Sequence, residues 1–313
     1  MADSSSNRVA ERKRHSFLVD FFIRLVKEKP LGTVSGALTL LLLLVGIFAG
    51  FLAPYGMNEP FPADRLLAPS AKYWLGTDNI GRDLLSRVIY GARISVIVGL
   101  AGSFMATSIS TIIGIVFGYL GGKADLIAQR LVDAVMCFPG LVLLLVVMSM
   151  VGPGMVQIII VIGISWGIWG SRVIRGATIA AKENVYVTAA VALGCSPIRI
   201  IIRHILPNVM APVIILLTTR VPGVILTEAS LSFLGLGIPP PAPSWGGMLG
   251  GAGRDNMLRA PWMAIWPGLA LATVVYSINM FGDAVRDLLD PRLRGGVGRY
   301  GVRKVKRVSQ KEK

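Results

Sequence analysis

The stretch LGTVSGALTLLLLLVGIFAGFLA, residues 31–53, carries no charged side chain and contains five consecutive leucines, Leu40 to Leu44. A helix needs about 20 apolar residues to cross the roughly 30 Å hydrocarbon core of a bilayer, and this stretch is long enough. The whole chain of 313 residues has the same bias, because 53% of its residues are hydrophobic and only 16% are charged. A typical soluble domain has about 25% charged residues. The sequence therefore predicts a polytopic membrane protein and excludes a soluble or disordered chain.

Further uncharged windows predict five more spans. One window, 134–171, is too long for a single span, and Gly152-Pro153-Gly154 divides it because these residues break a helix and favour a turn. We therefore predict an all-α membrane protein whose transmembrane domain covers residues 31–295, between a basic segment 1–30 and a basic tail 296–313. Its six transmembrane helices are expected at about 31–53, 94–120, 134–151, 155–171, 207–227 and 261–282.

Basic side chains predict the orientation of these spans. If the N-terminus is cytoplasmic, the inner segments contain 24 Lys and Arg residues and the outer segments contain 7. The positive-inside rule then places both termini in the cytoplasm. This bias also accounts for the net charge of +15, so we expect the lipid bilayer, and no nucleic acid, among the partners.

The loop ENVYVTAAVALGCSPIRIIIRHILP, residues 183–207, is expected to form two short helices on the cytoplasmic side. The first would run from Val185 to Leu193, with Gly194 in the left-handed conformation that often follows a helix. Ser196 can cap the second helix, whose first position is Pro197. Spacing alone leaves open an ordinary interfacial loop or a docking element. The apolar face of the second helix would consist of Ile198, Ile201, Ile202 and Ile205.

The same loop resembles the EAA loop of ATP-binding-cassette (ABC) importer permeases. Its pattern of two alanines, a glycine and a proline is matched by Ala189, Ala190, Gly194 and Pro207, while Thr188 stands where glutamate is usual. The resemblance implies that the loop forms a coupling helix, which docks in a groove of a cytoplasmic ATPase. The expected ATPase-coupling loop comprises Thr188, Ala189, Ala190, Gly194, Ser196, Pro197, Arg199 and Pro207.

Three longer segments extend the resemblance over roughly residues 30–295: LGTDNIGRDLLSRVIYGARISVIVG (75–99), EASLSFLGLGIPPPAPSWGGML (228–249) and DAVRDLLDPRLRG (283–295). They resemble the dipeptide/oligopeptide/nickel permease group, and most of all the second permease subunit of the dipeptide type. The resemblance implies a type I ABC importer permease of the bacterial plasma membrane, forming half of a path for peptides or similar small solutes. The implied partners are a homologous second permease, two ATPase subunits that hold ATP and Mg, and an extracytoplasmic substrate-binding protein.

Two outer segments carry further candidates. Residues 83–93 have the apolar stripe of an amphipathic helix lying on the outer membrane surface, and a preceding turn would place its N-terminus. The proline-rich segment 228–262 is expected to be a re-entrant or external gating loop, or a plain interfacial loop. Contact with the binding protein and structural anchoring are the alternatives for the residues singled out here, which are Asp78, Arg82, Asp83, Pro240 and Trp245.

Charged residues in or near the spans are candidates for the substrate path. Arg220 lies in the fifth span, where an arginine near the bilayer centre costs about 2.5–3.5 kcal/mol and should therefore face protein or water. It would attract a substrate carboxylate or pair with an acid of the sister subunit. Glu228 and Asp133 lie near span ends, where contact with lipid headgroups is the default interpretation. The candidate path consists of Arg220, Glu228 and Ser232.

Catalytic motifs are absent from the sequence. It contains neither a GxxxxGK[ST] phosphate-binding loop nor an HExxH motif, and its two cysteines and two histidines make no metal or nucleophile set. We therefore expect no enzyme activity, no metal and no cofactor in this chain, with ATP hydrolysis on partner subunits. A stand-alone secondary transporter is the alternative function, but it should show paired intramembrane acids or repeated halves, which these spans lack.

Overall fold

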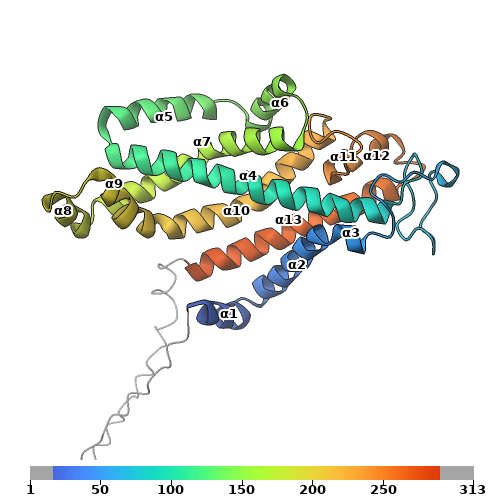
Figure 1. Ribbon diagram of the computed structural model, residues 1–313, viewed down its shortest axis with the longest axis horizontal. Coiled ribbons are helices and arrows are strands. Elements are labelled where there is room, and N and C mark those ends of the chain that lie inside the picture. Colours follow the sequence, from blue (N-terminus) through green and yellow to red (C-terminus); the bar gives the residue numbers. More distant parts are fainter. Residues whose placement is uncertain (1–16, 290–313) are drawn as a thin grey trace, which may run out of the picture.

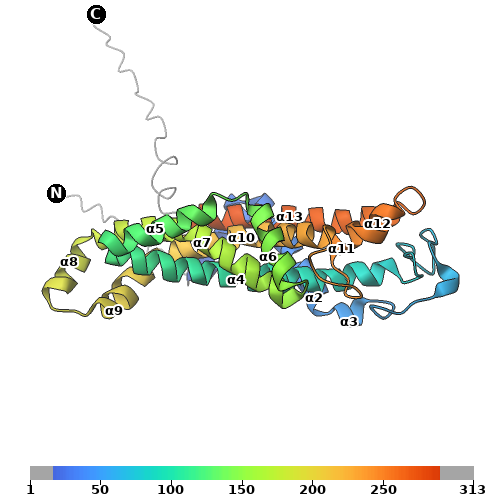
Figure 2. The same cartoon turned by 90° about the horizontal axis from the view of Figure 1, so that it is seen from above.

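The computed structural model describes residues 17–289, and within that range the fold consists of helices and loops, which agrees with the predicted all-α class. Five helices in this range are long and apolar enough to cross a membrane, and the bent pair α5–α6 makes a sixth if it counts as one span. The five run side by side in an elongated bundle (Figures 1 and 2). They are α2 (Pro30–Ile47), α4 (Leu84–Leu120), α7 (Met155–Lys182), the continuous helical segment Pro197–Phe233, which ends in α10 (Leu206–Phe233), and α13 (Trp262–Leu289). The predicted tail 296–313 and residues 1–16 lie outside the described range.

Short elements gather at the two ends of the bundle (Figure 1). One end holds α8 (Val185–Ala192), α9 (Pro197–Ile200) and the π-helix η2 (Ile201–Ile205). The other end holds α3 (Ala49–Leu52), the 3₁₀-helix η1 (Pro62–Asp64), α11 (Trp245–Leu249) and α12 (Gly251–Asp255). Because the basic segments predict that the α8 end is cytoplasmic, the end with α11 and α12 is the outer one.

Helix α1 (Phe17–Glu28) precedes the first span and packs near the C-terminal end of α13. The Lys29 ammonium forms an ion pair with the Asp287 carboxylate, and Leu25 packs with Ala284 and Leu288. The first and last spans are therefore joined where both approach the cytoplasmic end of the bundle.

Helix α4 is the centre of the bundle because it packs closely against both α7 and α10. A Cβ atom added at Gly114 would lie 2.7 Å from the Ser171 carbonyl oxygen of α7, and one at Gly99 would lie 2.7 Å from the Ile225 side chain of α10. Small residues allow this approach, which van der Waals packing must stabilise where lipid removes the hydrophobic driving force. The two largest clusters of the described core each include residues of α4, α7 and α10.

The structure contradicts the separate surface helix expected at residues 83–93. These residues form the first part of α4, which is 37 residues long and begins where the Asp83 carboxylate accepts a hydrogen bond from the Ser86 amide. No helix-breaking residue lies at the junction between the predicted surface helix, which ends at Arg93, and the predicted span, which begins at Ile94. At 1.5 Å per residue α4 is about 55 Å long, so its outer part extends beyond a hydrocarbon core of roughly 30 Å.

The third apolar window also differs from the straight span expected at 134–151. Helix α5 (Gly122–Met136) ends inside that window, and α6 (Gly140–Val151) follows at an angle of 87°. Pro139 lies in the break. Proline removes a backbone hydrogen-bond donor and disfavours helix at the preceding residue, so the helix is interrupted here. The turn predicted at Gly152-Pro153-Gly154 is confirmed, with both glycines at positive φ between α6 and α7.

We predict that Gly114→Ala lowers the thermal unfolding midpoint of the detergent-solubilised protein, because the new methyl group would meet α7 backbone atoms. Overpacking of this kind costs about 1–3 kcal/mol. Gly176→Ala is the matched control, since no atom outside its own helix backbone lies within 4 Å of a Cβ built there. Equal midpoints for the two variants would contradict the close approach of α4 and α7.

Candidate functional site

The cytoplasmic loop begins with the predicted first helix, α8. The Gly194 amide donates to the Val191 carbonyl at 2.9 Å and the Cys195 amide donates to the Ala190 carbonyl at 3.1 Å. These two bonds form a Schellman motif, which requires the left-handed conformation that Gly194 adopts at φ +76°. The predicted conformation of Gly194 is confirmed, and it sets the direction in which the chain leaves α8.

The second helix of the loop differs from the prediction. Ser196 precedes Pro197 at the start of α9, although the Ser196 side chain makes no capping hydrogen bond. After one turn the backbone changes to the π-helix η2, which places more residues in each turn than an α-helix does. The predicted shared face of four isoleucines is therefore wrong. Ile200 and Ile205 are buried, whereas Ile198 and Ile202 are 70% and 60% exposed.

Burial divides the predicted coupling residues. Ala190 packs in the core beside Val187, in contact with a cluster that includes Ile115 of α4 and Ile174 of α7. The structure gathers the other members of the set on the exposed surface at this end of the bundle; these are Thr188, Ala189, Gly194, Ser196, Pro197, Arg199 and Pro207.

Large apolar side chains are also exposed on this loop. Val185 is 84% exposed and Leu193 is 83% exposed, close to the fully hydrated limit. Exposed apolar side chains that gather in one region indicate an interaction site. We call Val185, Val191, Leu193 and Ile198 the loop patch.

Two ion pairs join α5 to α7, which leads directly into α8. Arg175 Nε donates to Asp125 Oδ1 at 2.6 Å and Arg175 Nη2 donates to Asp125 Oδ2, so this pair is bidentate. Arg172 pairs with Asp133 one turn further from α8. Asp133 therefore contacts an arginine of its own subunit, while its side chain remains 40% exposed and the headgroup interpretation stays a prediction. The sequence carried a signal, because Asp125 and Asp133 are spaced about two turns apart on α5, and Arg172 and Arg175 are about one turn apart on α7.

At the outer end, the predicted turn before α4 is fixed by two aspartates. Asp78 Oδ1 accepts hydrogen bonds from the Ile80 and Arg82 amides, and Asp78 Oδ2 accepts from Arg82 Nε at 2.6 Å. Asp83 caps α4 through both the amide and the hydroxyl of Ser86. This segment therefore positions the N-terminus of α4, as predicted.

A second polar network holds the outer loop that follows α3. Lys72 Nζ and the Tyr73 hydroxyl both donate to Asp64 Oδ2 at 2.8 Å. The hydrogen bond from Lys72, followed by that from Tyr73, holds the pKa of the Asp64 carboxyl below its usual value. Burial and the contact with Asp64 raise the pKa of the Tyr73 phenol. The ammonium of Lys72 also lies 4.8 Å from the centre of the Tyr73 ring.

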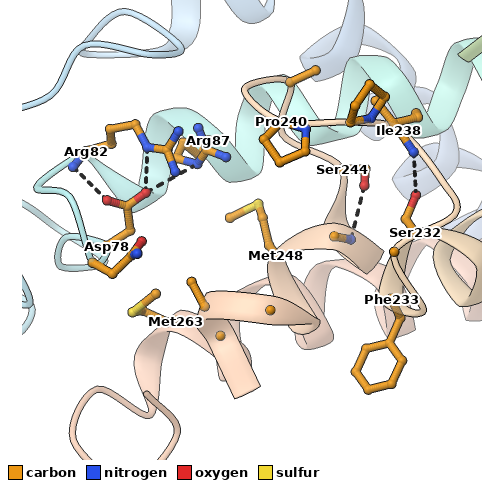
Figure 3. A pocket seen from close by; sticks show the side chains of 18 of the residues that line it. Asp78, Arg82, Arg87, Ser232, Phe233, Ile238, Pro240, Ser244, Met248 and Met263 are labelled. Carbon is orange, nitrogen blue, oxygen red and sulfur yellow. Dashed lines mark hydrogen bonds and ion pairs between the residues drawn. The ribbon is translucent and has the colours of Figure 1, made fainter. Parts of the chain in front are cut away.

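A cavity of about 320 Å³ opens between these outer segments (Figure 3). We call it the outer cavity. Of the five predicted outer residues, Asp78, Arg82 and Pro240 line it. Asp83 and Trp245 do not, because Asp83 caps α4 and buried Trp245 donates from Nε1 to the Val88 carbonyl at 3.0 Å. Sequence reasoning missed Arg87, Ser244, Met248 and Met263 in its wall, since they come from three segments that are distant in the sequence: α4, α11 with its N-cap, and α13.

Glu228 lies behind one wall of the outer cavity and is 0% exposed, so the headgroup interpretation of this residue is wrong. The Ser232 hydroxyl, which lines the cavity, donates to Glu228 Oε1 at 2.7 Å and accepts from the Ile238 amide at 3.2 Å. Glu228 Oε2 has no hydrogen-bond partner among the described residues. Two of the three candidate path residues, Glu228 and Ser232, are therefore in direct contact.

Arg220 lies deeper in the bundle and is only 7% exposed. Its Nη1 donates to the Ser110 hydroxyl at 3.1 Å, and that hydroxyl donates to the Gly167 carbonyl at 2.7 Å. The guanidinium fills the space where a side chain at Gly170 would lie. Arg220 is thus directed into its own subunit between α4 and α7, and its contact with a substrate or with a sister subunit stays a prediction.

Comparison with known proteins fits this helical arrangement. Residues 110–295 match the family model described as "Binding-protein-dependent transport system inner membrane component", and residues 16–69 match "N-terminal TM domain of oligopeptide transport permease C". The chain belongs to this family of inner-membrane permeases. It is 37% identical to the glutathione transport system permease protein GsiD of Pectobacterium atrosepticum over 276 residues, covering 88% of this chain and 91% of that protein. The GsiD protein of Escherichia coli O1:K1 is also 37% identical, over 275 residues.

A solved structure supports the fold independently. The MetNI methionine ABC transporter, in an inward-facing conformation, superposes with a TM-score of 0.52 at 16% sequence identity, covering 65% of this chain and 96% of that chain. The chain is an ABC importer permease of the bacterial inner membrane, and the comparisons favour this function over a stand-alone transporter. Membership of this family implies that it works with ATPases and a substrate-binding protein.

We predict that Asp125 and Arg175 are energetically coupled. In a double-mutant cycle with Asp125→Asn and Arg175→Gln, the interaction should be worth on the order of 1–2 kcal/mol, because both hydrogen bonds are charge-assisted and the pair is largely shielded from water. Unfolding of the purified protein measures this coupling. The exposed pair Arg254–Asp255, with side chains 70% and 66% exposed, is the control and should show almost none. A coupling as small as that of the control would contradict a structural role for the α5–α7 pairs.

Proposed function

We propose that this subunit forms half of a translocation path for peptide-like solutes and transmits ATPase movements to that path through the α8–α9 loop. The observation that carries the proposal is the loop patch, whose apolar side chains are exposed at the cytoplasmic end of a membrane bundle. Val185, Val191 and Leu193 lie outside the helices that are long and apolar enough to span a membrane, and an exposed apolar surface there fits a protein partner.

The loop is built to transmit movement. On its inner side, Val187 and Ala190 pack against Ile115 and Ile174, so α8 is fixed to the ends of α4 and α7. On its other side, η2 continues directly into α10. A partner with two states that grips the loop patch would therefore displace three long helices together.

The partners that we propose are those implied by membership of the family. Two ATPase subunits bind ATP and Mg and close on each other, while this chain contributes no cofactor of its own. A homologous second permease supplies the other half of the path, and an extracytoplasmic binding protein delivers the solute to the outer end.

A peptide-like solute is supported by the relatives, two of which are named as glutathione transport permeases at 37% identity. Glutathione is itself a small peptide derivative, so a dipeptide or short oligopeptide falls in the same chemical class. Within the subunit, we assign Ser232 and the buried Glu228 to the outer end of the path. Arg220 takes a structural role between α4, α7 and α10, because its donor faces Ser110.

To test the docking surface, we predict that Leu193→Asp lowers co-purification of the ATPases at least tenfold without lowering the amount of inserted permease. A buried carboxylate in a docked apolar interface would be unpaired and costly. Quantitative mass spectrometry of tagged complexes from native membranes measures the ratio of ATPase to permease.

Leu258→Asp is the matched control, since Leu258 is 99% exposed at the outer end and the substitution is chemically identical. It should leave the ratio unchanged. An unchanged ratio for Leu193→Asp would contradict the docking assignment, and an equal loss for both variants would point to a general defect in assembly.

A further inference from the structure

The outer cavity has unbalanced charge. Three charged side chains line it, Asp78, Arg82 and Arg87, so one carboxylate faces two guanidinium groups (Figure 3). The Asp78 carboxylate already accepts two backbone amides and Arg82 Nε, and it lies 3.7 Å from Arg87 Nε. A single carboxylate charge therefore faces two guanidinium charges, and among residues 17–289 the cavity lining provides no second carboxylate to balance the remaining positive charge.

The two arginines differ in their hydrogen-bond partners. Arg87 Nη1 donates to the Met57 carbonyl at 3.2 Å and lies 3.5 Å from the Pro241 carbonyl, so Arg87 joins two outer loops. The terminal Nη atoms of Arg82 make no hydrogen bond to any described residue, although the side chain is only 14% exposed. These Nη atoms keep some solvent-accessible surface, and an anionic oxygen is the acceptor that satisfies a guanidinium group best.

The rest of the cavity is suited to a small organic molecule. Apolar walls come from Ile238, Met248 and Met263, and hydroxyl groups come from Ser232 and Ser244. A volume of about 320 Å³ is at the lower end of the range of small-molecule sites, and such sites combine apolar walls with a few placed polar groups. Methionine adapts to ligands of varied shape.

We propose that the outer cavity binds a small carboxylate-bearing solute, whose carboxylate accepts hydrogen bonds from the terminal nitrogens of Arg82. Met248 and Met263 cover the apolar part of the solute, and Arg87 keeps the loops in place around it. The low exposure of Arg82 favours a small solute over a carboxylate on the surface of a partner protein. This site lies within one subunit, and it depends neither on the ATPases nor on the loop patch.

The test uses the purified full-length chain in lipid nanodiscs and two isosteric probes, N-acetyl-alanine and N-acetyl-alanine amide. Equilibrium dialysis with labelled probe should show saturable binding of the acid at millimolar concentration and at least tenfold weaker binding of the amide. Arg82→Gln should weaken binding of the acid about tenfold or more, because one charge-assisted pair is lost. Arg254→Gln, at an exposed arginine outside the cavity, is the control and should bind as the original chain does.

A second variant guards against local misfolding caused by loss of the Arg82–Asp78 contact. Ala252→Phe adds volume inside the cavity and leaves both arginines intact, so it should also abolish binding. Lack of saturable binding by the original chain, equal binding of acid and amide, or full binding by Arg82→Gln would each overturn the proposal. Because the assay measures binding alone, failure of the coupling proposal would leave its outcome unaffected.

Discussion

The close approach of α4 to α7 and α10 is the constraint on which the rest of this structure depends. In a bilayer, lipid tails solvate apolar helix surfaces as well as other helices do, so helices associate through packing and buried polar contacts. Gly114 and Gly99 bring α4 against its two neighbours, and the Arg220–Ser110–Gly167 chain of hydrogen bonds links the same three helices inside the bundle. Both functional ends are built on this unit.

At the cytoplasmic end, α7 and η2–α10 hold the α8–α9 loop from both sides. The pairs Arg175–Asp125 and Arg172–Asp133 add α5 to the same unit, so the bent α5–α6 segment is attached to the helix that leads into α8. At the outer end, the N-terminus of α4 and the C-terminus of α10 meet the proline-rich loop around the outer cavity. One packed unit therefore extends from the proposed ATPase contact to the proposed solute site.

Local signals in the sequence were sufficient wherever a single residue type decides the backbone. Gly194 ends α8 in the left-handed conformation, and Gly152-Pro153-Gly154 separates α6 from α7. The uncharged windows predicted which segments form the bundle, but they carry no information on the direction of a helix axis within a window. The 87° bend near Pro139 was therefore missed. The isoleucines of residues 198–205 fit an α-helical face equally well, and nothing in their spacing marks a π-helix.

The partners of charged residues were the least predictable feature. Asp133 and Glu228 look like span-end residues in the sequence, yet they contact Arg172 and Ser232. The outer cavity combines segments separated by more than 150 residues, such as Arg82 and Ser244. Only the folded arrangement of α4, α10 and the outer loops brings these groups together.

Coupling through the α8–α9 loop requires this loop to contact an ATPase. A photo-crosslinking amino acid at Ala189, which is exposed on α8, tests this contact directly in native membranes. Phe104 of α4, whose side chain is 65% exposed, serves as the reference position. We expect a crosslink from Ala189 to a nucleotide-binding subunit and none from Phe104 to that subunit. A crosslink from Ala189 to lipid alone would contradict it.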